Sequence, residues 1–238
     1  MNEPVDVTLT GPLAIVSLNS PPLNIFDVAM RDELIGALEA VDDVIDVRAM
    51  VLRAEGRHFS AGADLSEFGQ ADSIFEGRRI RWDRDPWGRL WHLRVPTVVA
   101  LHGTALGSGF EMSLLCDFRL AAPDTLLGLP ETKLGMLPAA GGTQSLTRAV
   151  GPHQALPIVA LGTTMDAAES LRRGLIHQVV DAVDDAALEL AERLAVLDPA
   201  TVRAARLATR AAGELPLEQG LAYERRLASL LAGRAGAG

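Results

Sequence analysis

The segment that best indicates the fold is HGTALGSGFEMSLLCDF, residues 102–118. It follows the β-prone run TVVAL, passes through a glycine-rich turn and continues as a helical run. Glycine allows the backbone of such a turn to approach a ligand closely, and the first N–H groups of a helix have no partner within that helix. In the helical run Glu111 is a charged residue among apolar and small neighbours. The segment therefore predicts a strand, a turn suited to face a ligand, and a helix that carries a carboxylate.

Strand and helix patterns alternate along the chain as far as Gly141. Two β-prone runs are separated by Gly11-Pro12, which indicates a hairpin, and residues 26–43 have helical apolar spacing with Asp27 as the expected N-cap. After Gly141 the pattern is helical, with LIHQVV as the one expected strand. We therefore expect an α/β fold in which helices pack on stacked or parallel sheets, followed by a mainly helical second half.

Composition limits the possible functions and surroundings. The chain has 238 residues, of which 48% are hydrophobic and 22% are charged, as is typical of a globular protein. Its formal net charge of -9 argues against a nucleic-acid-binding surface, which needs a basic face. Cys116 is the only cysteine, and the sequence has no recognisable signal peptide and no apolar run of about 18 residues. We expect a cytoplasmic protein without a membrane span or a nucleic-acid partner.

Familiar cofactor and metal motifs do not fit the sequence. The run GSGFEM has Met112 where a dinucleotide-binding loop needs its third glycine. The only lysine, Lys133, is preceded by Thr132, which excludes a P-loop. The five histidines lack the spacing of metal ligands. The sequence therefore predicts no metal site and no dinucleotide site.

A second glycine-containing turn, RHFSAGADL at residues 57–65, resembles the first in character. If N–H groups from both turns meet, they form a hole for a carbonyl oxygen that gains negative charge, and a thioester carbonyl would fit it. The two carboxylates nearby also have ordinary structural explanations. Ser108 and Glu111 have the spacing of a helix capping box, and Glu131 follows Pro130 as an acidic residue in the first turn of a helix. From the residues alone both explanations stay open.

Several motifs together resemble the enoyl-CoA hydratase/isomerase (crotonase) superfamily. They are SAGADL at residues 60–65, ALGSGFEMSLLCD at 105–117, LPETKLGMLPAAGGTQSLTRAVG at 129–151 and GLIHQVV at 174–180. The resemblance spans residues 5–226 and implies an α/β crotonase-like spiral of ββα units, with a C-terminal helical region that forms homotrimers or hexamers. It implies a core at residues 1–180 and a helical region at 181–238 that is shorter than is usual in the family.

The resemblance also assigns roles to single residues. It implies an oxyanion hole made by the backbone N–H groups of Ala63 and Ser108, which would hold the thioester oxygen of an acyl-CoA. Glu111 would mainly activate water, and Glu131 would mainly supply the proton at the α-carbon, with burial and mutual repulsion raising the pKa of one of them. The expected substrate-binding residues are Ala61, Asp64, Leu65, Gly107, Trp82, Trp87 and Ala139.

The activity that the resemblance implies is that of a hydro-lyase, an enoyl-CoA hydratase of fatty acid metabolism that adds water to a 2-enoyl-CoA. It would need no cofactor, because coenzyme A is part of the substrate. Two alternatives stay open: a double-bond isomerase that uses Glu131 alone, and a catalytically idle scaffold that binds acyl-CoA. Ser66 replaces a lysine that many family members use for the CoA phosphates, and the residues expected to compensate are Arg53, Arg57, Arg78, Arg79 and Arg81.

Overall fold

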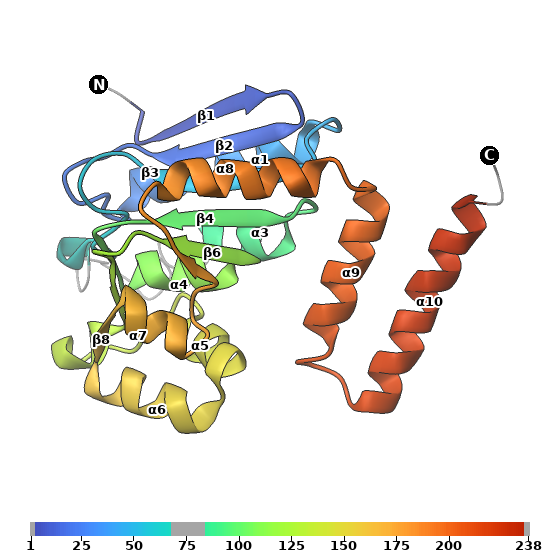
Figure 1. Cartoon of the computed structure of the whole chain (residues 1–238). Helices are drawn as coiled ribbons and strands as arrows, with labels where there is room; N and C mark the ends of the chain where they lie inside the picture. Colours follow the sequence, from blue (N-terminus) through green and yellow to red (C-terminus); the bar gives the residue numbers. More distant parts are fainter. Residues whose placement is uncertain (1–2, 68–83, 236–238) are drawn as a thin grey trace.

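The computed structural model describes residues 3–67 and 84–235, which form a mixed α/β fold with two sheets (Figure 1). The larger sheet has the order β1-β2-β3-β4-β6-β9, and the smaller has the order β5-β7-β8. The strands of the larger sheet are β1 (Val5–Thr10), β2 (Leu13–Leu18), β3 (Ala49–Ala54), β4 (Thr97–Leu101), β6 (Phe118–Ala121) and β9 (Gln178–Val179). Those of the smaller sheet are β5 (Thr104–Leu106), β7 (Leu126–Gly128) and β8 (Thr164–Asp166).

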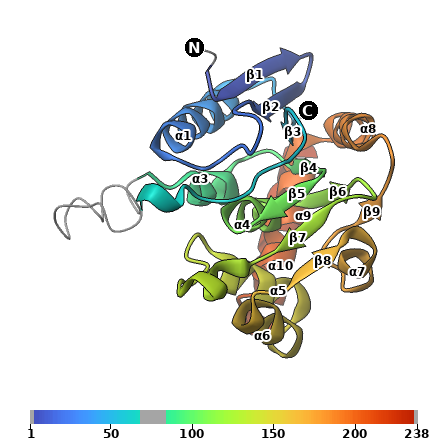
Figure 2. The same ribbon diagram turned by 90° about the vertical axis from the view of Figure 1, so that its left-hand side faces the viewer.

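Helices cover both faces of the larger sheet, in which all strand pairs after the antiparallel β1-β2 hairpin are parallel. On one face, α8 packs through Ala187 and Ala191 against Val51 and Val98, while α1 and α3 lie on the opposite side (Figure 2). Burial on both sides explains the nearly continuous apolar sequence of β3 and β4. The helices are α1 (Val28–Asp43), α3 (Pro86–His92), α4 (Ser108–Leu115), α5 (Gly142–Val150), α6 (Pro152–Leu161), α7 (Ala167–Arg172), α8 (Val183–Ala195), α9 (Pro199–Ala211) and α10 (Leu217–Ala235).

The local predictions for the N-terminal half are confirmed. The hairpin at Gly11-Pro12 joins β1 to β2, and α1 begins after Asp27, whose side chain accepts a hydrogen bond from the Met30 N–H at 2.8 Å. The segment that opens the sequence analysis contains β5, a turn at Gly107 and α4.

One prediction for the second half is wrong, because LIHQVV is not its only strand. Residues 164–166 form β8, which pairs antiparallel with β7. This strand has only three residues. It follows Gly162, which ends α6 in a left-handed conformation, and its own last residue, Asp166, caps α7. A strand this short has no periodicity to read, and it is defined by its partner β7 in the fold.

The last two helices, α9 and α10, stand beside the core as a pair (Figure 1). Asp117 joins α9 to the core, because its carboxylate accepts hydrogen bonds from Arg206 and Arg210 at 2.8 Å each and from the Thr97 N–H at 2.9 Å. Of the region expected at 181–238, α8 thus belongs to the layers of the core, whereas α10 packs mainly against α9. The division at residue 180 stays a prediction.

Candidate active site

A cavity of about 830 Å³ lies where the two glycine-containing turns meet the N-terminus of α4. The residues of the sequence prediction that line it are Ala61, Ala63, Asp64, Leu65, Trp87, Gly107, Ser108, Glu111, Glu131 and Ala139. These residues come from the segment after β3, from α3 and α4, and from the 3-10 helix η3 (Pro130–Leu134) with the loop that follows it. Trp82, which was also predicted, lies outside the described residues. The structure thus brings together residues that are distant in sequence.

Each of the two turns has a glycine with positive φ, and the turns approach each other closely at Gly62. Gly62 has φ +110°, and a Cβ there would lie 3.2 Å from the Leu106 carbonyl oxygen and 3.8 Å from the Ser108 nitrogen. Gly107 has φ +52°, and its Cβ would lie 3.0 Å from Glu131 Oε1. Two backbone hydrogen bonds join the segments: the Leu106 N–H donates to the Ser60 carbonyl oxygen at 3.0 Å, and the Ser60 N–H donates to the Thr104 carbonyl oxygen at 2.9 Å. The peptide groups of the two turns are therefore held side by side.

The N–H groups of Ala63 and Ser108 are available to a ligand in this cavity. Ser108 is the first residue of α4, so its N–H has no acceptor within the helix. Among the described residues, neither N–H donates a hydrogen bond to a protein group. Both residues line the cavity. The backbone thus offers two donors to an oxygen atom of a ligand.

Glu111 is almost completely buried, with 2% of its surface exposed. Its Oε1 atom accepts hydrogen bonds from the N–H groups of Ala140 at 2.9 Å and Gly142 at 2.8 Å, which favour the charged form of the carboxylate. The capping-box explanation is wrong, because Gly107 occupies the N-cap position and no side chain caps α4. Glu111 therefore joins α4 to the loop before α5 and faces the cavity.

Glu131 has a different environment on the other side of the cavity. It lies in the first turn of η3, as predicted, but its Oε2 atom is buried without a hydrogen-bond partner among the described residues. Burial raises the pKa of this carboxyl group above its usual value, opposed by a backbone hydrogen bond. The site therefore combines one carboxylate held by two backbone donors with a second carboxyl group whose pKa is raised by burial. The exposed Lys133, two residues further on, belongs to the same 3-10 helix.

Trp87 is buried at the wall of the cavity and contacts the backbone of α4. Its indole N–H donates a hydrogen bond to the carbonyl oxygen of Ser108 at 3.2 Å, and its ring lies 5.4 Å from that of Phe26. Phe26, Trp91 and Leu115 also line the cavity, and none of them was predicted. Their aromatic or apolar side chains are the only signal in the sequence, and such side chains are equally typical of the core.

Of the arginines that were expected to compensate for Ser66, the two that the structure describes, Arg53 and Arg57, do not line the cavity. Arg53 instead bonds Ser17 Oγ at 2.9 Å and pairs with Glu55 at 3.3 Å. Arg78, Arg79 and Arg81 lie outside the described residues. The cavity is lined by two other arginines, Arg31 and Arg148. Arg31 forms an ion pair with Glu67, whereas the hydrogen bonds of Arg148 go to Gln144 in its own helix.

Within residues 3–67 and 84–235, His, Cys, Asp and Glu side chains form no group of three or more that could bind a metal ion. No helix in these same ranges has the length and apolar character needed to cross a membrane.

Comparison with known proteins identifies the class to which this fold and cavity belong. The structure superposes with a TM-score of 0.90 on an enoyl-CoA hydratase subunit I from Geobacillus kaustophilus, at 35% identity and covering 97% of this chain and 90% of that one. The fold is therefore that of the crotonase class. A family model described as Enoyl-CoA hydratase/isomerase matches residues 9–234, and the chain belongs to this family.

Curated relatives are similar over most of their length. A probable enoyl-CoA hydratase from Mycobacterium tuberculosis is 39% identical over 219 residues, which are 90% of this chain and 84% of the relative. The 2,3-dehydroadipyl-CoA hydratase of Escherichia coli is 37% identical over 221 residues, which are 92% of this chain and 86% of that protein. The resemblance found in the motifs thus extends over the whole fold.

Proposed function

We propose that the protein is an enoyl-CoA hydratase, a hydro-lyase that adds water across the double bond of a 2-enoyl-CoA thioester. The observation that carries this proposal is the presence of two unlike carboxylates, Glu111 and Glu131, in one cavity with the free N–H groups of Ala63 and Ser108. The names of the relatives support the same activity, since the two compared above are named as a probable enoyl-CoA hydratase and a 2,3-dehydroadipyl-CoA hydratase.

In the proposed reaction the thioester oxygen accepts hydrogen bonds from the N–H groups of Ala63 and Ser108. These bonds stabilise the negative charge that develops on the oxygen when water attacks C3. Glu111, in its charged form, takes a proton from the attacking water, whose oxygen forms the new bond to C3. Glu131, in its protonated form, gives its proton to C2 as the enolate collapses. The N–H of Ala139 helps to hold the water. Transfer of a proton from Glu111 to Glu131 then restores the starting state.

Crotonyl-CoA hydration by the wild type and by Glu111→Gln and Glu131→Gln tests this proposal. Each substitution keeps the shape of the side chain and removes its acid–base function, so kcat is expected to fall about 100- to 10,000-fold. Glu189→Gln, an exposed position on α8, is the matched control and keeps wild-type kcat. Absence of crotonyl-CoA hydration by the wild type would contradict the proposal, as would isomerisation of 3-enoyl-CoA that survives in Glu111→Gln.

The wider setting of this activity is also part of the proposal. We infer a homotrimer or hexamer in the cytoplasm, working in fatty acid metabolism without a cofactor other than the coenzyme A of its substrate. The pair α9 and α10 supports the oligomer, because it stands beside the core with Leu217 and Leu230 exposed. Light scattering coupled to size-exclusion chromatography measures the mass, and a monomer at micromolar concentration would contradict this inference.

A further inference from the structure

Trp87 is linked to both turns that carry the proposed oxyanion-hole donors. It contacts one turn directly, and it contacts Phe26, which in turn is bonded to the other. On the first side, its indole N–H donates a buried hydrogen bond to the carbonyl oxygen of Ser108 at 3.2 Å. This bond restrains the residue whose own N–H is one of the two donors. Trp87 is itself held in place, because Asp85 caps the start of α3 by accepting a hydrogen bond from the Gly88 N–H at 3.0 Å.

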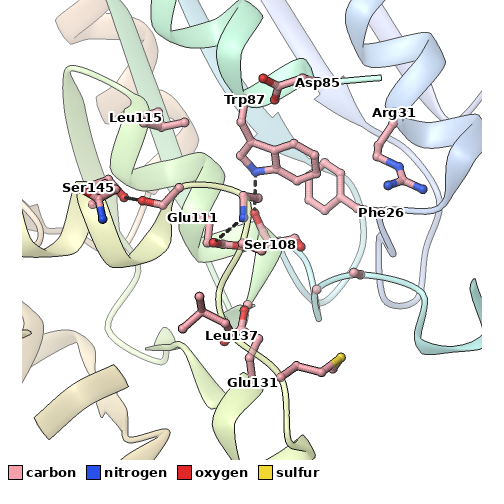
Figure 3. A pocket seen from close by; sticks show the side chains of 18 of the residues that line it. Phe26, Arg31, Asp85, Trp87, Ser108, Glu111, Leu115, Glu131, Leu137 and Ser145 are labelled. Atoms are coloured by element: carbon pink, nitrogen blue, oxygen red, sulfur yellow. Dashed lines mark hydrogen bonds between the residues drawn. The ribbon is translucent and has the colours of Figure 1, made fainter. Parts of the chain in front are cut away.

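On the second side, Phe26 holds the residues on either side of Ala63. The Phe26 N–H donates to the Gly62 carbonyl oxygen at 2.9 Å, and the Phe26 carbonyl oxygen accepts from the Asp64 N–H at 3.4 Å. These two bonds form a parallel bridge between Phe26 and Ala63 that leaves the Ala63 N–H to the cavity. The Phe26 ring is buried and lies 5.4 Å from the Trp87 ring at an interplanar angle of 47° (Figure 3).

We infer that Trp87 is a positioning residue that sets the relative placement of the two oxyanion-hole donors. This inference rests on the proposed function. A catalytic site must hold its groups within about 0.5 Å of the productive geometry, and donors of this kind act mainly on the developing charge of the transition state. In a simpler explanation, the bond to Ser108 only provides the acceptor that any buried indole N–H needs. The two roles differ in their effect on kcat.

The test removes the indole N–H and keeps an aromatic ring against Phe26, by Trp87→Phe. With crotonyl-CoA, kcat is expected to fall about tenfold or more, while the dissociation constant of the saturated analogue butyryl-CoA changes less than threefold. The carbonyl stretch of a bound enoyl thioester, measured by infrared difference spectroscopy, is expected to shift less from its solution frequency than in the wild type, because the two donors polarise the carbonyl less strongly.

Trp91→Phe is the matched control, because it removes the other indole of α3 that lines the cavity. The Arg210 guanidinium lies over that ring, 3.9 Å from its centroid, and among the described residues no hydrogen bond or ring pair joins Trp91 to Ser108 or Phe26. The carbonyl frequency of the bound thioester is expected to stay at the wild-type value in this variant. A second variant, Phe26→Leu, removes the ring contact from the other side and is expected to reduce both kcat and the carbonyl shift, as Trp87→Phe does.

Three results would overturn the inference. The first is a Trp87→Phe enzyme with wild-type kcat and carbonyl shift. The second is a parallel loss of kcat and butyryl-CoA affinity in Trp87→Phe, which would make Trp87 an acyl contact only. The third is a loss of carbonyl shift in Trp91→Phe equal to that in Trp87→Phe. The proposed function fails in a different way, through absence of turnover by the wild type. The carbonyl shift can still be measured then, since it requires binding but no reaction.

Discussion

At the scale of single residues, replacing each of the two cavity glutamates by glutamine is expected to change the stability of the fold in opposite directions. Glu131 is buried with a raised pKa, so burial disfavours its ionised form. A group whose pKa is higher in the folded state contributes stability at low pH that is lost as the pH rises through that pKa. Glu131→Gln is therefore expected to raise Tm at pH 7 and to leave it nearly unchanged at pH 4, which thermal unfolding at the two pH values would measure.

Glu111→Gln is expected to lower Tm. Oε1 of Glu111 accepts two backbone hydrogen bonds, and an amide oxygen accepts such bonds more weakly than a carboxylate oxygen. We expect a loss of about 1–2 kcal/mol in the free energy of unfolding, measured by urea denaturation at pH 7. If both variants change stability in the same direction, the assignment of one ionised and one protonated carboxyl group is wrong.

The pH dependence of turnover follows from the same difference. Since Glu131 must be protonated to deliver its proton to C2, kcat is expected to fall as the pH rises past the raised pKa of this group. The pKa that describes this alkaline limb is expected to lie above 4.5, the ordinary value of a glutamate. A pH profile of kcat for crotonyl-CoA hydration measures it, and a limb that persists in Glu131→Gln would belong to another group.

The donor role of the Ser108 backbone can be tested with proline, because Ser108 is the first residue of α4 and proline is tolerated at that position of a helix. Ser108→Pro removes the N–H, and kcat is expected to fall roughly 100- to 1000-fold. Ser108→Ala retains the N–H and is expected to stay within a few-fold of wild type. Equal losses in the two variants would show that the side chain, and not the N–H, matters.

At the scale of helices and strands, the attachment of α9 depends on Asp117. This side chain is 13% exposed and pairs with both Arg206 and Arg210. Asp117→Ala leaves two largely buried guanidinium groups without their carboxylate, at an expected cost of about 3–5 kcal/mol in the free energy of unfolding. The exposed Asp124 provides a control, since Asp124→Asn is expected to change stability by less than about 0.5 kcal/mol. Similar values for the two variants in urea denaturation would contradict this account.

Elements defined by local sequence could be predicted, and elements defined by distant partners could not. The α1 cap at Asp27 and the strand-turn-helix around Gly107 follow from neighbouring residues. By contrast, the Glu111 carboxylate is held by Gly142, which is 31 residues away in sequence. The capping-box spacing at Ser108 was misleading for a related reason: Gly107, with φ +52°, takes the cap position when it packs against Gly62.

At the scale of the whole molecule, removal of α10 is expected to affect the stability of the core only slightly but to abolish the proposed oligomer. Because α10 packs mainly against α9, a chain that ends at Leu215 is expected to keep its core folded, with Tm lowered by less than about 4 °C, which corresponds to about 1 kcal/mol. The assembly mass measured by light scattering is expected to fall to that of a monomer. A truncated chain that keeps the mass of the full assembly would show that other surfaces hold it together.

The 3-10 helix η3 has a practical consequence for studying this molecule. Lys133 is the only lysine among 22 basic residues, and its side chain is exposed two residues after Glu131. Apart from the amino terminus, an amine-selective fluorophore would therefore attach at a single position, without any engineered cysteine. Because that position adjoins the cavity wall, fluorescence of the attached dye would report ligand binding in a protein that carries no substitution.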